Sequence, residues 1–180
     1  PNDPGSAGRA TTRTLVIGVW PWSYILQVGD SRYYQYCKGE LTQISRDQTM
    51  AQALVDQGIM SQAFSEQSPL ANVLSSSIGG AQTAPVVTRI PNSWDNIHLL
   101  CSDGLTGLVE SATINQIVTQ LAGRPPDVVS ALIDAANDAG GKDNVTVVYV
   151  EGDLFAATRA RARAISAVAR ERSAGSLASR

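Results

Sequence analysis

The stretch "HLLCSDGLTGLVE", residues 98–110, joins an apolar segment to a turn within a few residues. Leu99 and Cys101 are typical of the inner end of a buried strand. Asp103 follows almost at once, and Gly104 comes directly after it. Glycine places few restrictions on the backbone, so the chain can leave the strand in any direction. The stretch therefore predicts a strand whose tip presents a carboxylate, with Gly104 letting the backbone depart without blocking a cation.

Two other aspartates occupy comparable positions. Asp143 precedes the apolar run in "AGGKDNVTVVYV", residues 139–150, and Asp30 follows another apolar run in "VGDSR", residues 28–32. Any one of them could simply begin a turn, because Asp accepts hydrogen bonds from nearby backbone amides. Three short carboxylates at strand ends could also converge, and carboxylate oxygen is the ligand that Mg²⁺ prefers.

The candidate metal ligands are therefore Asp30, Asp103 and Asp143. We expect the carboxylates of Asp103 and Asp143 to approach within about 6 Å, where like charges favour a bound cation. His98 is the only histidine, and its place in mid-strand indicates a core or surface role rather than a catalytic one.

The hydrophobic pattern predicts an α+β protein, because strands come first, then helices, then strands again. Four early strands suggest a meander whose first two members form an antiparallel hairpin around Trp-Pro-Trp. We expect strands at 14–20, 23–29, 32–37, 41–45, 86–90, 96–101 and 144–150, and helices at 48–57, 112–122 and 125–139. Residues 59–85 are rich in Ser and Gln and predict short helices within a mobile surface segment.

The last residues differ in composition from the rest of the chain. Residues 154–180 contain six Arg and one Glu, and their Ala and Arg content favours a helix. We therefore divide the chain into a domain over 1–152 and a basic helical tail or linker over 153–180. Because such a tail would not pack on the domain, a chain ending near Gly152 is expected to be as stable as the whole.

The overall composition excludes several classes of protein. The chain has 180 residues, 43% of them hydrophobic, and a net charge of −2, which gives no reason to expect nucleic acid as a partner. Its apolar runs are far shorter than the roughly 20 residues that a membrane helix needs, so no membrane insertion is expected. Cys37 and Cys101 suggest no disulfide framework, which favours a reducing, cytoplasmic location.

Three ordered blocks resemble the motifs of the PPM family, the metal-dependent serine/threonine phosphatases of the protein phosphatase 2C type. They are "YILQVGDSRYYQYCKGELTQISRDQT" (24–49), "HLLCSDGLTGLV" (98–109) and "GGKDNVTVVYV" (140–150). The segment "ATTRTLVIGVW" (10–20) is similar to a further family strand, and the resemblance to bacterial members covers roughly residues 8–151.

The resemblance implies an antiparallel β-sandwich flanked by helices, in four layers αββα. It also implies hydrolysis of phosphoserine and phosphothreonine in proteins by a metal-activated water at a two-metal centre. In such a centre Asp103 and Asp143 would ligate Mn²⁺ or Mg²⁺, and Asp30 would serve, with Asp103, a third and weaker metal site. The expected partners are a phosphorylated protein substrate and a serine/threonine kinase.

Departures from the family pattern leave other functions open. The family's N-terminal part, with its Asp-Gly-x-Gly-Gly-His block, does not precede Pro1, so the fold is expected to be incomplete there and this fragment inactive alone. Ala10, Gln48 and Gly107 replace a Gly, a His and an Asp that are usual in the family. The alternatives are a degenerate phosphatase-like module that binds a phosphoprotein or regulatory partner without turnover, and a purely structural metal-binding domain.

Overall fold

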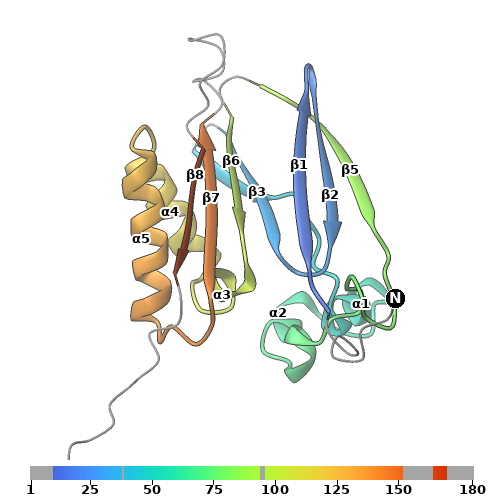
Figure 1. Cartoon of the computed structure of the whole chain (residues 1–180). Helices are drawn as coiled ribbons and strands as arrows, with labels where there is room; N and C mark the ends of the chain where they lie inside the picture. Colours follow the sequence, from blue (N-terminus) through green and yellow to red (C-terminus); the bar gives the residue numbers. More distant parts are fainter. Residues whose placement is uncertain (1–9, 38, 94–95, 152–163, 170–180) are drawn as a thin grey trace, which may run out of the picture. The chain divides into compact units, whose positions relative to one another are not determined.

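A computed structural model describes residues 10–37, 39–93, 96–151 and 164–169. The chain forms two compact units, of which the first comprises 1–33 with 43–93 and the second 34–42 with 94–180. Each unit contains one antiparallel sheet with its own helices (Figure 1). The combination of antiparallel sheets and separate helices confirms the α+β class.

The first unit is built on a three-stranded sheet. The strand order is β1-β2-β5, and both neighbouring pairs are antiparallel. Trp20 and Pro21 connect the first pair, so the hairpin expected around Trp-Pro-Trp is confirmed. The strands are β1 (Arg13–Val19), β2 (Trp22–Val28) and β5 (Val86–Pro91).

Three short helices lie at one end of this sheet, in the segment between β4 and β5 (Figure 1). They are α1 (Met50–Asp56), α2 (Gln62–Ser65) and the 3₁₀ helix η2 (Pro69–Asn72). Each helix is capped at its N-terminus by a hydroxyl group. The side chains of Thr49, Ser61 and Ser68 each accept a hydrogen bond from a backbone N–H of the first turn. The short helices expected within residues 59–85 are confirmed by α2 and η2.

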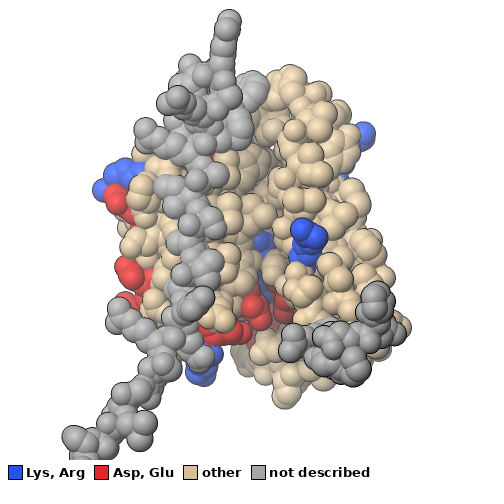
Figure 2. All heavy atoms as spheres, in the orientation of Figure 1, with Lys and Arg blue, Asp and Glu red and all other residues tan. Residues whose placement is uncertain are grey.

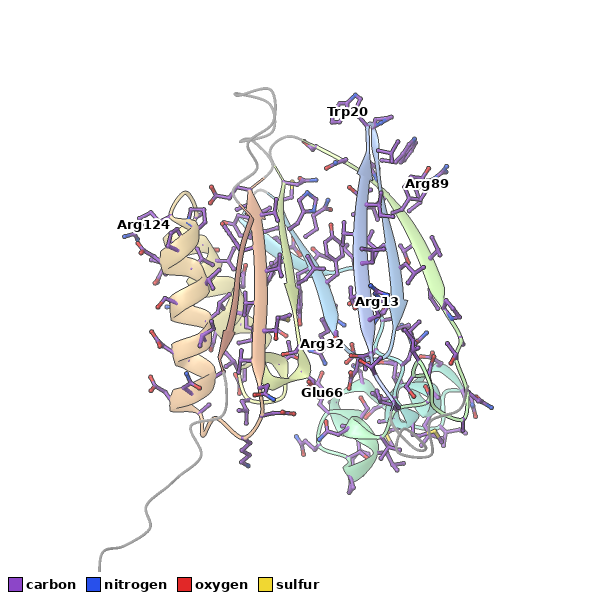
Figure 3. The ribbon with its side chains drawn as sticks, in the orientation of Figure 1. Arg13, Trp20, Arg32, Glu66, Arg89 and Arg124 are labelled. Carbon is purple, nitrogen blue, oxygen red and sulfur yellow. The ribbon has the colours of Figure 1, made fainter. Side chains whose placement is uncertain are left out.

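One face of the three-stranded sheet exposes apolar side chains. Paired residues of antiparallel strands point to the same side of a sheet, so Leu15, Leu26 and Val87 share this face. Most of the surface visible over β1 and β2 carries neither acidic nor basic side chains (Figure 2). Arg89 covers part of the face, with its guanidinium 4.5 Å from the centre of the Trp22 ring (Figure 3).

The second unit is built on a five-stranded sheet of order β4-β3-β6-β7-β8. The strands are β3 (Arg32–Cys37), β4 (Glu40–Gln43), β6 (Ile97–Cys101), β7 (Val145–Glu151) and β8 (Ala164–Ala169). The helices are α3 (Asp103–Thr106), α4 (Ser111–Leu121) and α5 (Pro125–Asp138). The last two pack together on one face of the sheet, as expected (Figure 1).

The core of the second unit lies between this sheet and its helices. Leu99 of β6, Val147 of β7 and Leu132 of α5 are completely buried in a single apolar cluster. Among the described residues, no helix is both long enough and apolar enough to cross a membrane. The core fixes the ends of β6 and β7 relative to each other, because both strands contribute alternate residues to it.

Most of the predicted elements are confirmed within one or two residues, but the meander is wrong. β2 pairs with β1 and β5, whereas β3 is a neighbour of β4 and β6 in the other sheet. The chain leaves the first sheet at Gly29, whose φ of 104° is a conformation that side-chain-bearing residues rarely adopt. A local strand pattern predicts strands but not their partners, which is why the sequence suggested consecutive pairing.

The predicted helix in the basic tail is also wrong for residues 164–169. These residues form β8, which pairs antiparallel with β7 from Val145↔Ala169 to Val150↔Ala164. Helix propensity is a weak preference, and here the unpaired backbone groups at the edge of β7 outweigh it. The expectation that the tail does not pack on the domain is therefore wrong for β8, which belongs to the same sheet as β7. The remaining tail residues lie outside the described part of the chain, so the boundary at residue 152 stays a prediction.

We predict that the same substitution has different costs on the two faces of the first sheet. Ile25 is 2% exposed, whereas Ile17 on the neighbouring strand is 50% exposed. Ile25→Thr removes buried apolar contacts and buries a hydroxyl, so it should lower the free energy of unfolding by about 2 kcal/mol or more. Ile17→Thr should change it by less than about 0.5 kcal/mol. Urea titration monitored by circular dichroism measures both, and equal losses would contradict the assigned faces.

Candidate metal centre

Asp103 lies where β6 passes into α3. Cys101 ends the strand, Ser102 caps the helix, and Asp103 is the first helical residue, with its side chain exposed to solvent. Leu105, two residues later, is completely buried and anchors the short helix in the core. A buried strand on one side and a buried leucine on the other leave Asp103 with little freedom of position.

Ser102 joins this turn to the segment that carries Asp143. The Ser102 hydroxyl donates to the carbonyl oxygen of Asn144 over 3.1 Å and accepts the backbone N–H of Thr146 over 3.0 Å. The backbone N–H of Ser102 also donates to the carbonyl of Thr146, over 3.0 Å. Asp103 and Asp143 are the sequence neighbours of Ser102 and Asn144, and both side chains are exposed. The structure thus holds their two segments together at one end of the sheet.

Gly104 is required by the closeness of these segments. A Cβ atom at this position would lie 2.3 Å from the carbonyl oxygen of Asn144 and 2.9 Å from its carbonyl carbon. Both are backbone atoms, so they cannot move aside as a flexible side chain would. The sequence pointed to Gly104 for its backbone freedom, but its physical reason is the absence of a side chain at a close approach.

Asp30 lies in the other unit, in the turn between β2 and β3, and its side chain is partly buried. Side chains hold this turn, since Thr14 Oγ1 donates to the carbonyl of Ser31 over 2.8 Å and Thr12 Oγ1 lies 3.0 Å from Ser31 Oγ. Because Asp30 belongs to the first unit and the other two aspartates to the second, the convergence of all three stays a prediction, as does the 6 Å separation.

The donor set within each unit is small. Neither unit contains, among its described residues, three or more His, Cys, Asp or Glu side chains grouped so that they could hold a metal ion. In the second unit the structure instead places two exposed carboxylates on adjoining segments. Such a pair suits a hard cation that keeps several waters, because Mg²⁺ is commonly held by one or two carboxylates.

Asp47 precedes Gln48, which replaces the histidine of the family pattern, and Asp47 itself has a structural role. Its carboxylate accepts hydrogen bonds from Arg32, at 2.7 Å from Nη2 and 3.0 Å from Nε, and from Gln43 at 3.1 Å (Figure 3 labels Arg32). Its side chain is only 15% exposed. A two-point Arg–carboxylate pair fixes the start of β3 to the segment before α1.

The single histidine lies within the fold, as expected. His98, in the middle of β6, is 9% exposed, and burial lowers its pKa from the ordinary 6.5. The neutral imidazole is therefore the form that the folded protein prefers.

We predict that replacing Gly104 by Ala weakens the structure at this site. The clash with backbone should lower the free energy of unfolding by about 1–3 kcal/mol, because the two segments must separate. Gly18→Ala is the control, since a Cβ at Gly18 would meet only Asn92 Nδ2 at 3.7 Å. Thermal unfolding of both variants tests this, and an unchanged melting temperature for Gly104→Ala would contradict the close approach.

The lowered pKa of His98 predicts a loss of stability in mild acid. The unfolded chain binds a proton at His98 near pH 6.5, whereas the folded protein binds it only at lower pH. Stability should therefore be at its full value above about pH 6.5 and fall as the pH drops below that value. His98→Gln should flatten this part of the profile. Melting temperatures from pH 8 to pH 5 measure it, and identical slopes for both proteins would refute the assignment.

Comparisons with known proteins show what the chain resembles. No protein-family model matches it. The serine/threonine protein phosphatase PstP of Mycobacterium tuberculosis is 33% identical over 152 residues, which are 83% of this chain and 29% of PstP. The serine/threonine phosphatase Stp of Listeria monocytogenes is 33% identical over 148 residues, which are 82% of this chain and 58% of Stp. The chain thus spans less than two thirds of these relatives.

Solved structures show the same similarity. The crystal structure of the M. tuberculosis phosphatase PstP/Ppp matches with a TM-score of 0.77 and 33% identity, over 82% of this chain and 62% of that one. A second structure, of the PstP catalytic domain in complex with two manganese ions, matches with a TM-score of 0.70 and 33% identity, over 79% and 59% of the two chains. At this level of identity the likeness covers both sequence and fold.

Proposed function

We propose, because this chain belongs to the bacterial PPM-type serine/threonine protein phosphatases, that it is part of an enzyme that removes phosphate from phosphoserine and phosphothreonine in proteins. The observation that carries the proposal is the joined pair of segments with Asp103 and Asp143. Two exposed carboxylates stand there on strand ends that the core holds rigidly. A rigid pair of this kind can bind hard cations without reorganising.

The proposal gives each aspartate a role. Asp103 and Asp143 would hold a centre of two Mn²⁺ or Mg²⁺ ions, and Asp30 would contribute, with Asp103, to a third and weaker site. The support is the pair of manganese ions in the PstP catalytic domain together with the oxygen-only donor set of this chain. Bound divalent cations supply an activated water and neutralise charge on the phosphoryl oxygens.

The described residues also position the segments that carry the proposed metal ligands. Ser102 holds the two segments together through its hydroxyl, and Gly104 permits their close approach. His98 is buried in the strand, so the proposal assigns it no proton transfer.

The proposed substrate is a phosphorylated protein, and the proposed counterpart in the cell is a serine/threonine kinase. We further propose a cytoplasmic location, supported by a sequence in which Cys37 and Cys101 suggest no disulfide framework.

The alternative is a phosphatase-like module that binds a phosphoprotein without hydrolysing it. Gln48 and Gly107 support it, because they replace residue types that are usual in the family. Gly107 has φ −78° and ψ −14°, which any residue adopts, but a Cβ atom there would lie 3.0 Å from the carbonyl oxygen of Asp103. Activity in the presence of metal distinguishes the two functions.

The proposed metal site predicts selective effects of charge removal. Asp103→Asn and Asp143→Asn should each weaken Mn²⁺ binding to the chain at least about tenfold, since each removes a negatively charged ligand. Asp134→Asn, on the exposed face of α5, is the matched control and should leave Mn²⁺ binding unchanged. Isothermal titration with MnCl₂ measures the affinities, and circular dichroism checks that each variant is folded.

The same variants test the reaction. In a chain completed at its N-terminal side with the family's metal ligands, Asp103→Asn should reduce hydrolysis of a phosphothreonine peptide more than about a hundredfold. Asp30→Asn should slow turnover while Mn²⁺ still binds at the two main sites. Full activity of Asp103→Asn would reject the two-metal assignment, and a completed but inactive wild type that binds phosphopeptide would favour the binding module.

A further inference from the structure

Gln48, the residue that departs from the family's usual histidine, makes hydrogen bonds to three separate segments of the first unit. Its backbone N–H donates to the carbonyl of Gly29 over 3.0 Å, and its backbone carbonyl accepts from Ser75 N–H over 2.9 Å. Its side-chain oxygen Oε1 accepts from Gly29 N–H over 2.7 Å, and Nε2 donates to the carbonyl of Ala84 over 2.7 Å. One side chain thus bridges the β2–β3 turn to the segment that leads into β5.

The orientation of the Gln48 amide is determined by its partners. Gly29 N–H can only donate and the Ala84 carbonyl can only accept, so Oε1 must face Gly29 and Nε2 must face Ala84. Both distances are short for bonds between uncharged groups. A residue that only accepts, or only donates, would satisfy one partner and leave the other unpaired.

The turn held by Gln48 is the one that carries Asp30. Gly29 directly precedes Asp30 and has both its N–H and its carbonyl bonded to Gln48. Gly29 also lies close to Thr12, because a Cβ there would lie 2.3 Å from Thr12 Cγ2. The orientation of the Asp30 side chain therefore depends on a backbone segment that hydrogen bonds to Gln48 and close packing against Thr12 both restrict.

We infer that Gln48 is a positioning residue, which acts through Gly29 to hold the Asp30 turn against the segment at Ala84. The inference rests on the proposed function only for the metal role of Asp30, since the hydrogen bonds themselves belong to the described structure. We call Gln48, Gly29 and Ala84 the Gln48 clamp. Gln has no titratable group, so the clamp keeps one donor and one acceptor at every pH.

A histidine at this position would make the clamp dependent on pH. A neutral imidazole can accept from Gly29 while donating to Ala84, whereas a protonated one donates from both nitrogens and leaves Gly29 N–H without an acceptor. The hydrogen bond from Gly29 N–H would then be present above the ordinary histidine pKa of about 6.5 and be lost below it. Charged groups on the surrounding segments are the same in all variants, so their effect on the pH dependence is removed when the variants are compared. These groups are Asp30, Arg32, Arg46, Asp47 and Asp56.

Amide hydrogen exchange at Gly29, followed by NMR in the full 180-residue chain, tests the clamp directly. Gln48→Ala should make the Gly29 amide exchange about three to ten times faster, because it loses its side-chain acceptor. Gln52→Ala is the matched control, since the side chain of Gln52 donates a hydrogen bond to Asp56, which is exposed on α1. It should leave exchange at Gly29 unchanged. Unaltered exchange in Gln48→Ala would overturn the inference.

Gln48→His provides a second variant in case Gln48→Ala fails to fold. At pH 8 the Gly29 amide should be protected as in the original chain, and below about pH 5.5 its protection should fall to the level expected without an acceptor. The inference would be overturned if the Gly29 amide in Gln48→His showed the same protection from exchange as in the original chain at both pH values. A role limited to filling space would show no such profile.

Line broadening by added Mn²⁺ separates the clamp from the proposed metal role. If Asp30 serves a metal site, its amide resonance should broaden in the original chain and need more Mn²⁺ to broaden in Gln48→Ala. Absence of broadening at Asp30 in the original chain would reject the metal role of Asp30. The Gly29 exchange rates would still decide whether Gln48 holds the turn, so the two failures have different signatures.

Discussion

The close approach between Gly104 and Asn144 is the constraint on which the candidate site depends. The absence of a Cβ allows the start of α3 to lie against the backbone that precedes β7, at a separation no other residue permits. Ser102 secures the same contact from the neighbouring position with its hydroxyl. Asp103 and Asp143 thereby occupy adjoining segments, although both are exposed to solvent.

The core behind this contact explains how exposed side chains can be held in place. Leu99, Val147 and Leu132 are completely buried, and their strands and helix carry the turns at which the aspartates stand. The first unit uses a different device, because the Asp30 turn is held by polar side chains, chiefly Gln48 and the hydroxyls around Ser31. The position of Asp103 thus depends mainly on packing, and that of Asp30 depends mainly on hydrogen bonds. Packing and hydrogen bonds respond differently to substitution.

The sequence predicted much of the fold because its signals are local. Alternation of apolar residues predicted the strands, the 3.6-residue period predicted α4 and α5, and Gly140 followed the last helix as expected. Asp103 and Asp143 were recognised by their position beside apolar runs, and the structure places their segments together. The positioning role of Ser102 could have been suspected only from its place beside Asp103, since a lone serine carries no such signal.

The sequence by itself determined most of the strands and helices and which carboxylates stand at strand ends, because backbone propensity and hydrophobic period act over a few residues. Tertiary structure alone decided that β2 and β3 belong to different sheets and that residues 164–169 pair with β7 rather than form a helix. It also explains the close approach at Gly104 and the hydrogen bonds by which Gln48 joins two segments. Both depend on atoms far away in the chain, and contacts between distant segments leave no periodic trace in the sequence.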